Sequence, residues 1–158
     1  MFAIGDKVVY PMHGAGYIEA IETIDDMPYY KLFLPLTQMT IRMMTEKAAD
    51  AGLRPVREKA AVETVKEILA AKGKSLMGSW NKRYRKALDE LKSGDLEKVA
   101  EVFRDLTNFD RKGKISSHEV RLLNLARELL QSEIMYILDY TEQEAAIFVR
   151  NALDGKAE

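Results

Sequence analysis

The stretch from residue 72 to residue 86 combines the only tryptophan of the chain, Trp80, with its densest positive charge. A cation binds phosphate oxygens, and an indole ring stacks on a base or enters the groove beside it. Six basic residues, with no acidic residue among them, lie in this stretch: Lys72, Lys74, Lys82, Arg83, Arg85 and Lys86. The combination predicts contact with a nucleic-acid groove, with Trp80 as an apolar wedge and the cations on the backbone.

The positive charge is confined to this part of the chain. Residues 72–92 carry seven basic and two acidic side chains, whereas the whole chain has a formal net charge of −1. Residues 93–158 carry nine basic and thirteen acidic side chains, and this acidity repels DNA. The distribution favours a local contact with few phosphates, and hence a shallow salt dependence, over general polyanion binding.

A helix is expected to begin at Trp80. Ser79 suits the N-cap, because its hydroxyl accepts a hydrogen bond from an unpaired backbone N–H. Apolar residues follow at helical spacing: Trp80, Tyr84, Ala87, Leu88 and Leu91. This spacing allows two interpretations. Trp80 is either the first core residue of an amphipathic helix, with the basic residues on its solvated face, or an exposed ring that projects beyond the core from the first turn.

The pattern divides the chain into two domains with an α+β fold overall. Residues 1–53 contain short apolar or alternating runs separated by turn formers, which predict a small SH3- or Tudor-like β-barrel. The runs cover 7–10, 17–24, 29–34 and 39–44. From residue 54 to residue 158 the period changes to 3.6 and predicts an all-helical domain of about five helices.

Within the helical domain, residues 72–78 are expected to form a linker and residues 108–114 a polar loop. Asp95 suits the N-cap of the helix that follows the Trp80 helix. Ser116 with Glu119, and Thr141 with Glu144, have the spacing of capping boxes. These boxes predict a long helix to about Leu138 and a last helix to about Leu153.

Composition excludes several classes of site. The chain has no cysteine, so neither disulfides nor thiolate metal sites are expected. His13 and His118 are far apart and lack the spacing of a zinc motif, and His118 is interpreted as a surface residue. No catalytic constellation can be assembled, so we expect no enzyme activity, cofactor or metal. No apolar run approaches the roughly 18–20 residues that span a bilayer, and no signal peptide is recognisable, so a cytoplasmic protein without membrane contact is expected. Nothing in the sequence indicates stable self-association, so a monomer is expected.

Two motifs in this order resemble one known family. Residues 5–16 read GDKVVYPMHGAG, and residues 79–84 read SWNKRY. Residues 93–106 are also similar to the helical domain of the same family. The chain thus resembles the CarD/CdnL family of bacterial transcription regulators over nearly its whole length. Its barrel also resembles the polymerase-interacting domain of transcription-repair coupling factor.

The resemblance implies a regulator that binds the RNA polymerase β subunit through the barrel and promoter DNA through the helices. The residue matching the family tryptophan is Trp80, which would enter the minor groove at the upstream edge of the transcription bubble and stabilise the open complex. DNA would be recognised largely independently of sequence. The cations implied on the DNA backbone are Lys82, Arg83, Arg85 and Lys86.

For the polymerase contact, the resemblance implies pairing of an edge strand with the β subunit. The matching regions are 22–24 and 40–43, and the implied contact residues are Thr23, Ile24, Arg42 and Met43. Arg42 matches a basic residue of the family contact, whereas Ile24 stands where another basic residue is expected. The main alternative is a protein-interaction adaptor without DNA contact, in which the basic segment is only a solvated face.

Overall fold

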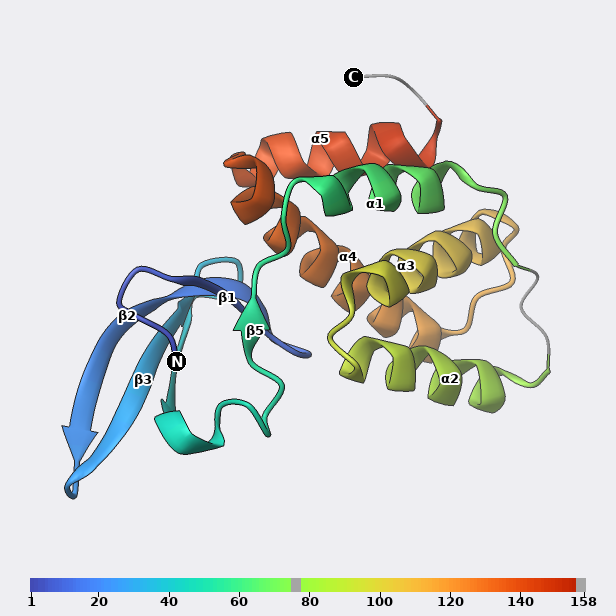
Figure 1. The fold of residues 1–158 in the computed structure, drawn as a ribbon. Helices are drawn as coiled ribbons and strands as arrows, with labels where there is room; N and C mark the ends of the chain where they lie inside the picture. The colour runs from blue at the N-terminus through green and yellow to red at the C-terminus, as the bar shows by residue number, and fades with distance from the viewer. Residues whose placement is uncertain (75–77, 156–158) are drawn as a thin grey trace.

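The computed structural model describes residues 1–74 and 78–155. An antiparallel sheet is followed by a group of helices beside it (Figure 1). The strands are β1 (Lys7–Tyr10), β2 (Gly14–Ile24), β3 (Met27–Leu34), β4 (Met39–Met44) and β5 (Arg54–Pro55). The helices are α1 (Ala60–Ala70), α2 (Trp80–Lys92), α3 (Leu96–Arg111), α4 (Ser117–Leu138) and α5 (Glu142–Leu153). The predicted α+β fold, a barrel-like sheet and then helices, is confirmed.

The sheet has the strand order β4-β3-β2-β1-β5. Asp25 and Asp26, both with positive φ, join β2 to β3 in a two-residue turn that matches the twist of a hairpin. A small core lies on one face of the sheet and includes Ile18, Tyr30 and Leu32. Because β5 pairs with β1, residues 54 and 55 complete the sheet, and the predicted division at residue 53 falls just before this last strand.

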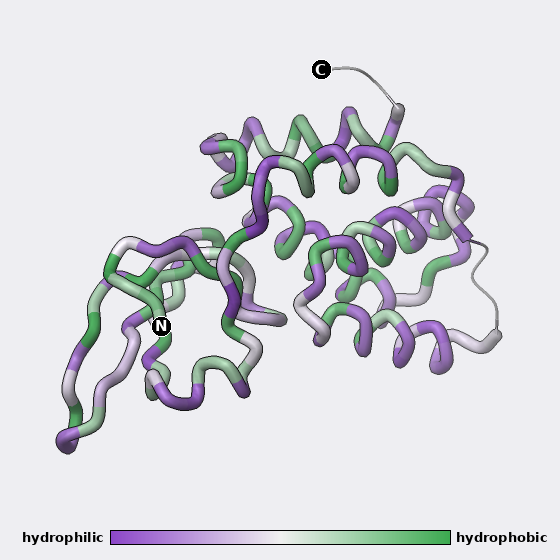
Figure 2. Tube along the Cα trace, viewed as in Figure 1, coloured by the Kyte–Doolittle hydropathy of each residue, from purple (hydrophilic) through white to green (hydrophobic). Residues whose placement is uncertain are grey.

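The helices begin where local sequence signals place them. Ser79 accepts from Lys82 N and Asp95 accepts from Glu97 N, as expected of N-caps. Both predicted capping boxes, at the starts of α4 and α5, are formed. Hydrophobic and hydrophilic positions alternate along each helix (Figure 2), and the apolar positions meet in a second, larger core.

The prediction of a polar loop at residues 108–114 is wrong for its first part, because α3 continues to Arg111. Phe109 lies under the guanidinium of Arg83, and Arg111 forms an ion pair with Asp154, so tertiary contacts extend the helix through polar residues. The linker predicted for residues 72–78 falls partly on residues 75–77, which lie outside the described residues.

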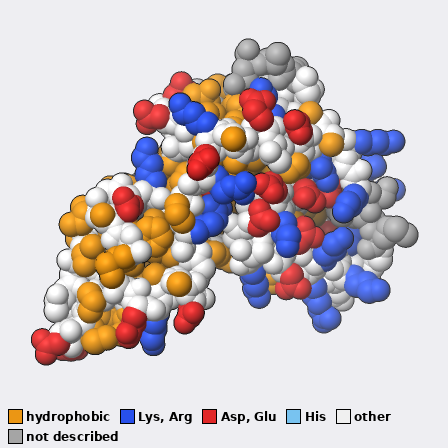
Figure 3. All heavy atoms as spheres, in the orientation of Figure 1, with side chains coloured by type: hydrophobic (Ala, Val, Ile, Leu, Met, Phe, Trp, Pro, Cys, Tyr) orange, Lys and Arg blue, Asp and Glu red, His pale blue; other side chains and the backbone are white. Residues whose placement is uncertain are grey.

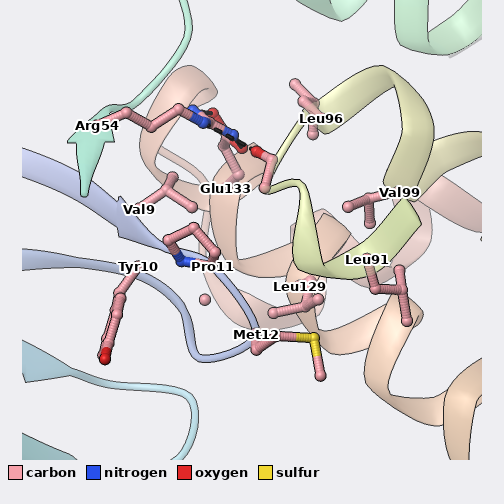
Figure 4. A pocket seen from close by; sticks show the side chains of 12 residues that line it. Val9, Tyr10, Pro11, Met12, Arg54, Leu91, Leu96, Val99, Leu129 and Glu133 are labelled. Atoms are coloured by element: carbon pink, nitrogen blue, oxygen red, sulfur yellow. Dashed lines mark hydrogen bonds and ion pairs between the residues drawn. The ribbon is translucent and has the colours of Figure 1, made fainter. Parts of the chain in front are cut away.

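The β1–β2 turn inserts between the sheet and the helices. In Figure 4, Met12 extends from this turn toward Leu91 and Leu129. Pro11 packs against Gly94, where an added Cβ would lie 2.8 Å from the proline ring. The remaining cavity measures about 10 Å³, which is room for about one water molecule. The sheet and the helices are therefore closely packed against each other.

Polar contacts fix the same junction. Glu133 of α4 is buried, and its carboxylate accepts two hydrogen bonds from Arg54 of β5, at 2.8 and 2.7 Å (Figure 4). Arg54 also donates to the carbonyl oxygen of Gly94, between α2 and α3, at 2.9 Å. The Ser132 hydroxyl accepts from Ala15 N of β2 at 3.0 Å. These bonds hold one orientation of the helices on the sheet.

None of the helices in the described ranges is long and apolar enough to cross a membrane. Residues 1–74 and 78–155 also contain no group of three or more histidine, aspartate or glutamate side chains arranged to hold a metal ion.

Candidate functional site

Trp80 is the first residue of α2, and its side chain lies at the surface with 40% of the residue exposed. The residues that follow it at helical spacing turn inward: Ala87 and Leu91 are buried, and Tyr84 packs against the core. The exposed ring of Trp80 therefore lies at the start of a helix whose later apolar residues are packed. Of the two interpretations that the spacing allowed, the structure supports the exposed ring.

The indole of Trp80 is stacked on the imidazole of His118, which lies in the first turn of α4. The ring centroids are 4.7 Å apart and the planes differ by 6°. Tyr84 meets the same imidazole edge-on, at 6.4 Å and 84°. The first turns of α2 and α4 therefore form an aromatic cluster at the surface, with Trp80 on its outside.

Arg83 faces the protein. Its Nε and Nη2 atoms donate to the two carboxylate oxygens of Glu119 at 2.9 and 2.8 Å, and its Nη1 donates to the carbonyl oxygen of Gly78 at 2.8 Å. The Arg83 side chain is 13% exposed, and that of Glu119 is fully buried. Three N–H groups of Arg83 are thus bonded within the protein, and of the four cations predicted to hold the DNA backbone Arg83 is the least exposed.

The Arg83–Glu119 pair is stabilised in its charged form. Burial raises the pKa of Glu119, but hydrogen bonds from Arg83 and from the Ser116 hydroxyl and N–H together outweigh it, so the pKa lies below its ordinary value of 4.5. The hydrogen bond to Glu119 in turn raises the pKa of Arg83. The pair ties the start of α2 to the start of α4.

We expect Glu119→Gln to lower the free energy of unfolding at pH 7 by about 1–3 kcal/mol, because the buried guanidinium loses its counter-ion. A group with a lowered folded-state pKa contributes stability above its unfolded pKa and loses it as the pH falls through the folded value. The difference from wild type should therefore shrink below pH 4.5. Urea unfolding between pH 7 and pH 3 measures it, with the exposed Glu128→Gln on the same helix as control. A difference that stays the same at every pH would show that the ionised Glu119 carboxylate is not the source of this stability.

Lys82, Arg85 and Lys86 are exposed on α2. None of the three takes part in a salt bridge within the described ranges. Lys and Arg side chains gather over this helix in the space-filling view (Figure 3). These three cations are thus available to an anionic partner, whereas Arg83 on the same helix binds Glu119 of α4.

The residues predicted to contact the polymerase lie on two edges of the sheet. Arg42 is exposed on β4, an outer strand, and its Nε donates to Glu22 of β2 at 2.8 Å. Thr23 and Ile24 are exposed at the end of β2. The Met43 side chain is buried in the sheet core, which leaves its backbone as the part that a partner strand can reach.

A second edge arises within β2. Strand β1 pairs only with residues 14–17 of β2, and Ile18 bonds to Gly5 and Asp6. Among the described residues no strand covers the outer side of residues 19–24. This edge is separated from the edge of β4 by the whole width of β3, so one partner strand can pair with only one of them. The structure does not bring residues 22–24 and 40–43 together on a single edge.

Comparisons with known proteins match both parts of the chain. Residues 2–57 match the family model described as the CarD-like/TRCF RID domain, and residues 64–150 match the model described as CarD, C-terminal domain. The chain belongs to the CarD/CdnL family. This CarD-family chain is also 34% identical over 152 residues to "Putative transcription factor YdeB" of Bacillus subtilis (strain 168), with 94% of this chain and 99% of that protein covered.

The contacts of two site residues in this CarD-family protein could not be predicted from the sequence. His118 was placed correctly at the surface, but its stacking on Trp80 was not expected, and Glu119 was assigned only a capping role. The capping box was the available signal, because it places both residues in the first turn of α4. Nothing local in the sequence indicates that this turn meets the first turn of α2.

Proposed function

We propose that this CarD-family transcription regulator binds the RNA polymerase β subunit through an edge of its sheet and promoter DNA through the first turn of α2. One observation carries the proposal: Trp80 is exposed on a turn that is held in place by buried contacts. Three exposed cations, Lys82, Arg85 and Lys86, lie on the same helix. An aromatic plane beside free cations is what a groove contact requires.

The proposed action is to keep melted promoter DNA from closing. At the upstream edge of the bubble the last base pair has lost a stacking neighbour, and an indole inserted there from the minor groove supplies one. Stacking of a base on an aromatic side chain contributes about 1–3 kcal/mol. Because a ligand shifts an equilibrium toward the state it binds more tightly, Trp80 would raise the population of the open complex.

Few phosphate contacts suffice in this arrangement. A sheet bound to the polymerase places the helices next to the promoter, so the DNA contact becomes intramolecular and acts at a high effective concentration. The junction around Glu133 and Arg54 keeps the distance between the two contacts constant. DNA binding by the free protein is therefore expected to be weak, in keeping with a net charge of −1.

For the polymerase contact we propose strand addition at β4, where main-chain groups give affinity and flanking side chains give specificity. Arg42 is the exposed cation of this strand. Its hydrogen bond and charge lower the pKa of Glu22, so the two side chains form a charged pair on the outer face. A β-subunit strand at this edge would lie against Arg42.

Arg42→Glu should weaken polymerase binding at least tenfold, because it reverses the charge at this edge and places a second carboxylate beside Glu22. Binding to immobilised polymerase holoenzyme, without DNA, measures the effect. Lys112→Glu, an equal charge change at an exposed position after α3, is the control and should bind normally. Unchanged binding of Arg42→Glu would exclude β4 as the polymerase contact and leave the free edge of β2 as the candidate.

A further inference from the structure

His118 covers one face of the only tryptophan in the chain. The imidazole and the indole are parallel within 6° at a centroid distance of 4.7 Å, which is a stacked pair. Tyr84 packs edge-on against the imidazole and is itself anchored in the helical core. The indole therefore rests on a support that reaches back into the folded protein, while 40% of the Trp80 residue stays exposed.

Such a support matters because of where Trp80 lies. A half-exposed side chain in the first turn of a helix has few neighbours to restrict its rotamers, and ordering it on binding costs conformational entropy. Stacking on His118 selects one ring orientation before DNA arrives. Preorganisation of this kind strengthens binding, because the side chain loses less conformational entropy when DNA binds.

The neighbouring ion pair makes the support rigid. Glu119, the residue after His118, binds Arg83, which lies one helical turn after Trp80. The starts of α2 and α4 are thus joined twice, once by a buried ion pair and once by the stacked rings. The ion pair sets the distance between the two turns, and the stacked rings set the orientation of the indole.

We propose that His118 is a positioning residue for Trp80: it holds the indole so that a single face and one edge are presented to DNA. The proposal rests on the proposed function of Trp80 in DNA contact and adds a residue to it. His118 acts through Trp80, and its planar ring rather than its charge is the property required.

The stack can be tested without polymerase, because Trp80 is the only tryptophan and its fluorescence reports this site alone. We expect His118→Ala to raise the iodide quenching constant of the free protein about twofold, since it uncovers the indole face that the imidazole shields. His118→Phe should keep the wild-type value, because phenylalanine can stack. Ser117→Ala, an exposed neighbour on the same turn, is the control. Equal quenching in wild type and His118→Ala would overturn the proposal.

The functional test is the half-life of open promoter complexes after addition of a competitor, measured with saturating full-length protein. The expected result is a half-life about 2- to 10-fold shorter for His118→Ala than for wild type, in line with the worth of one aromatic pair, and a wild-type half-life for His118→Phe. A normal half-life for His118→Ala, together with a short one for Trp80→Ala, would overturn the role of His118 while leaving the function of Trp80 intact. If Trp80→Ala itself has no effect, the proposed DNA contact falls, and the role of His118 falls with it.

Discussion

Replacing Glu133 by alanine should lower the free energy of unfolding by about 2–4 kcal/mol, one of the two largest effects expected for this protein. The Glu133 carboxylate is 3% exposed and accepts hydrogen bonds from Arg54 and from the backbone N–H of Arg57. Removing one partner of a buried ion pair leaves the other uncompensated, which typically costs about 3–5 kcal/mol. Because the Arg54 side chain is 24% exposed and can recover some hydration, the loss expected here is lower, at about 2–4 kcal/mol.

Urea unfolding at pH 7 measures this loss, and Glu128→Ala, an exposed position on the same helix, is the control. A double-mutant cycle with Arg54→Ala separates the interaction of the pair from the other effects of each change. We expect a coupling free energy above about 1 kcal/mol, as for residues in direct contact. Additive effects would mean that Arg54 and Glu133 do not hold the sheet and the helices together.

The loss of Glu133 should also uncouple polymerase binding from promoter opening. Arg54 belongs to β5 and Glu133 to α4, so their contact fixes where the helices lie relative to the sheet. If β4 is the polymerase contact, as proposed, a variant with a loosened junction would still present this strand but would place Trp80 less accurately. At a temperature where Glu133→Ala is folded, binding to polymerase should remain and the open-complex half-life should fall.

The second large effect concerns Trp80. Trp80→Ala should shorten the open-complex half-life by about 5- to 150-fold, the equivalent of losing about 1–3 kcal/mol of stacking. Its effect on folding should be small, below about 1 kcal/mol, because the ring packs on His118 at the surface and fills no part of the core. Trp80→Phe keeps an aromatic ring and should retain part of the effect.

Competitor challenge of preformed complexes measures the half-life, and urea unfolding of the same variants measures the stability. The two readouts distinguish a wedge from a core residue. A Trp80→Ala protein that unfolds readily would show that the ring is structural. A variant that is stable and gives long-lived open complexes would show that the ring has no role in DNA contact.

The sequence predicted those parts of the fold that depend on neighbouring residues. The N-caps at Ser79 and Asp95 and the boxes at Ser116 and Thr141 form as expected, because a cap needs only groups within three residues of it. The runs that became β1 to β4 were equally evident, since alternation and turn formers are local. Strand β5 was missed, because its two residues are defined by their pairing with β1. The end of α3 was also missed, because packing of Phe109 and pairing of Arg111 extend the helix through polar residues.

The candidate site was predicted only in part, because its geometry depends on distant residues. Arg83 and Glu119 are 36 positions apart, and Arg54 and Glu133 are 79 positions apart. In the sequence Arg83 is indistinguishable from Lys82 and Arg85, although it faces a buried carboxylate and they face solvent. Likewise, the residue types of regions 22–24 and 40–43 do not reveal that β3 separates them.

Trp80 is proposed to act on promoter DNA from a protein anchored to the polymerase. The most direct test places a fluorescent base analogue at the upstream edge of the bubble and compares the open fraction with wild type, Trp80→Ala and Arg42→Glu. We predict that wild type raises the open fraction, and that both variants fail while only Arg42→Glu loses polymerase binding. If Trp80→Ala binds polymerase and raises the open fraction as wild type does, the claim is contradicted, and an adaptor without DNA contact becomes the better account.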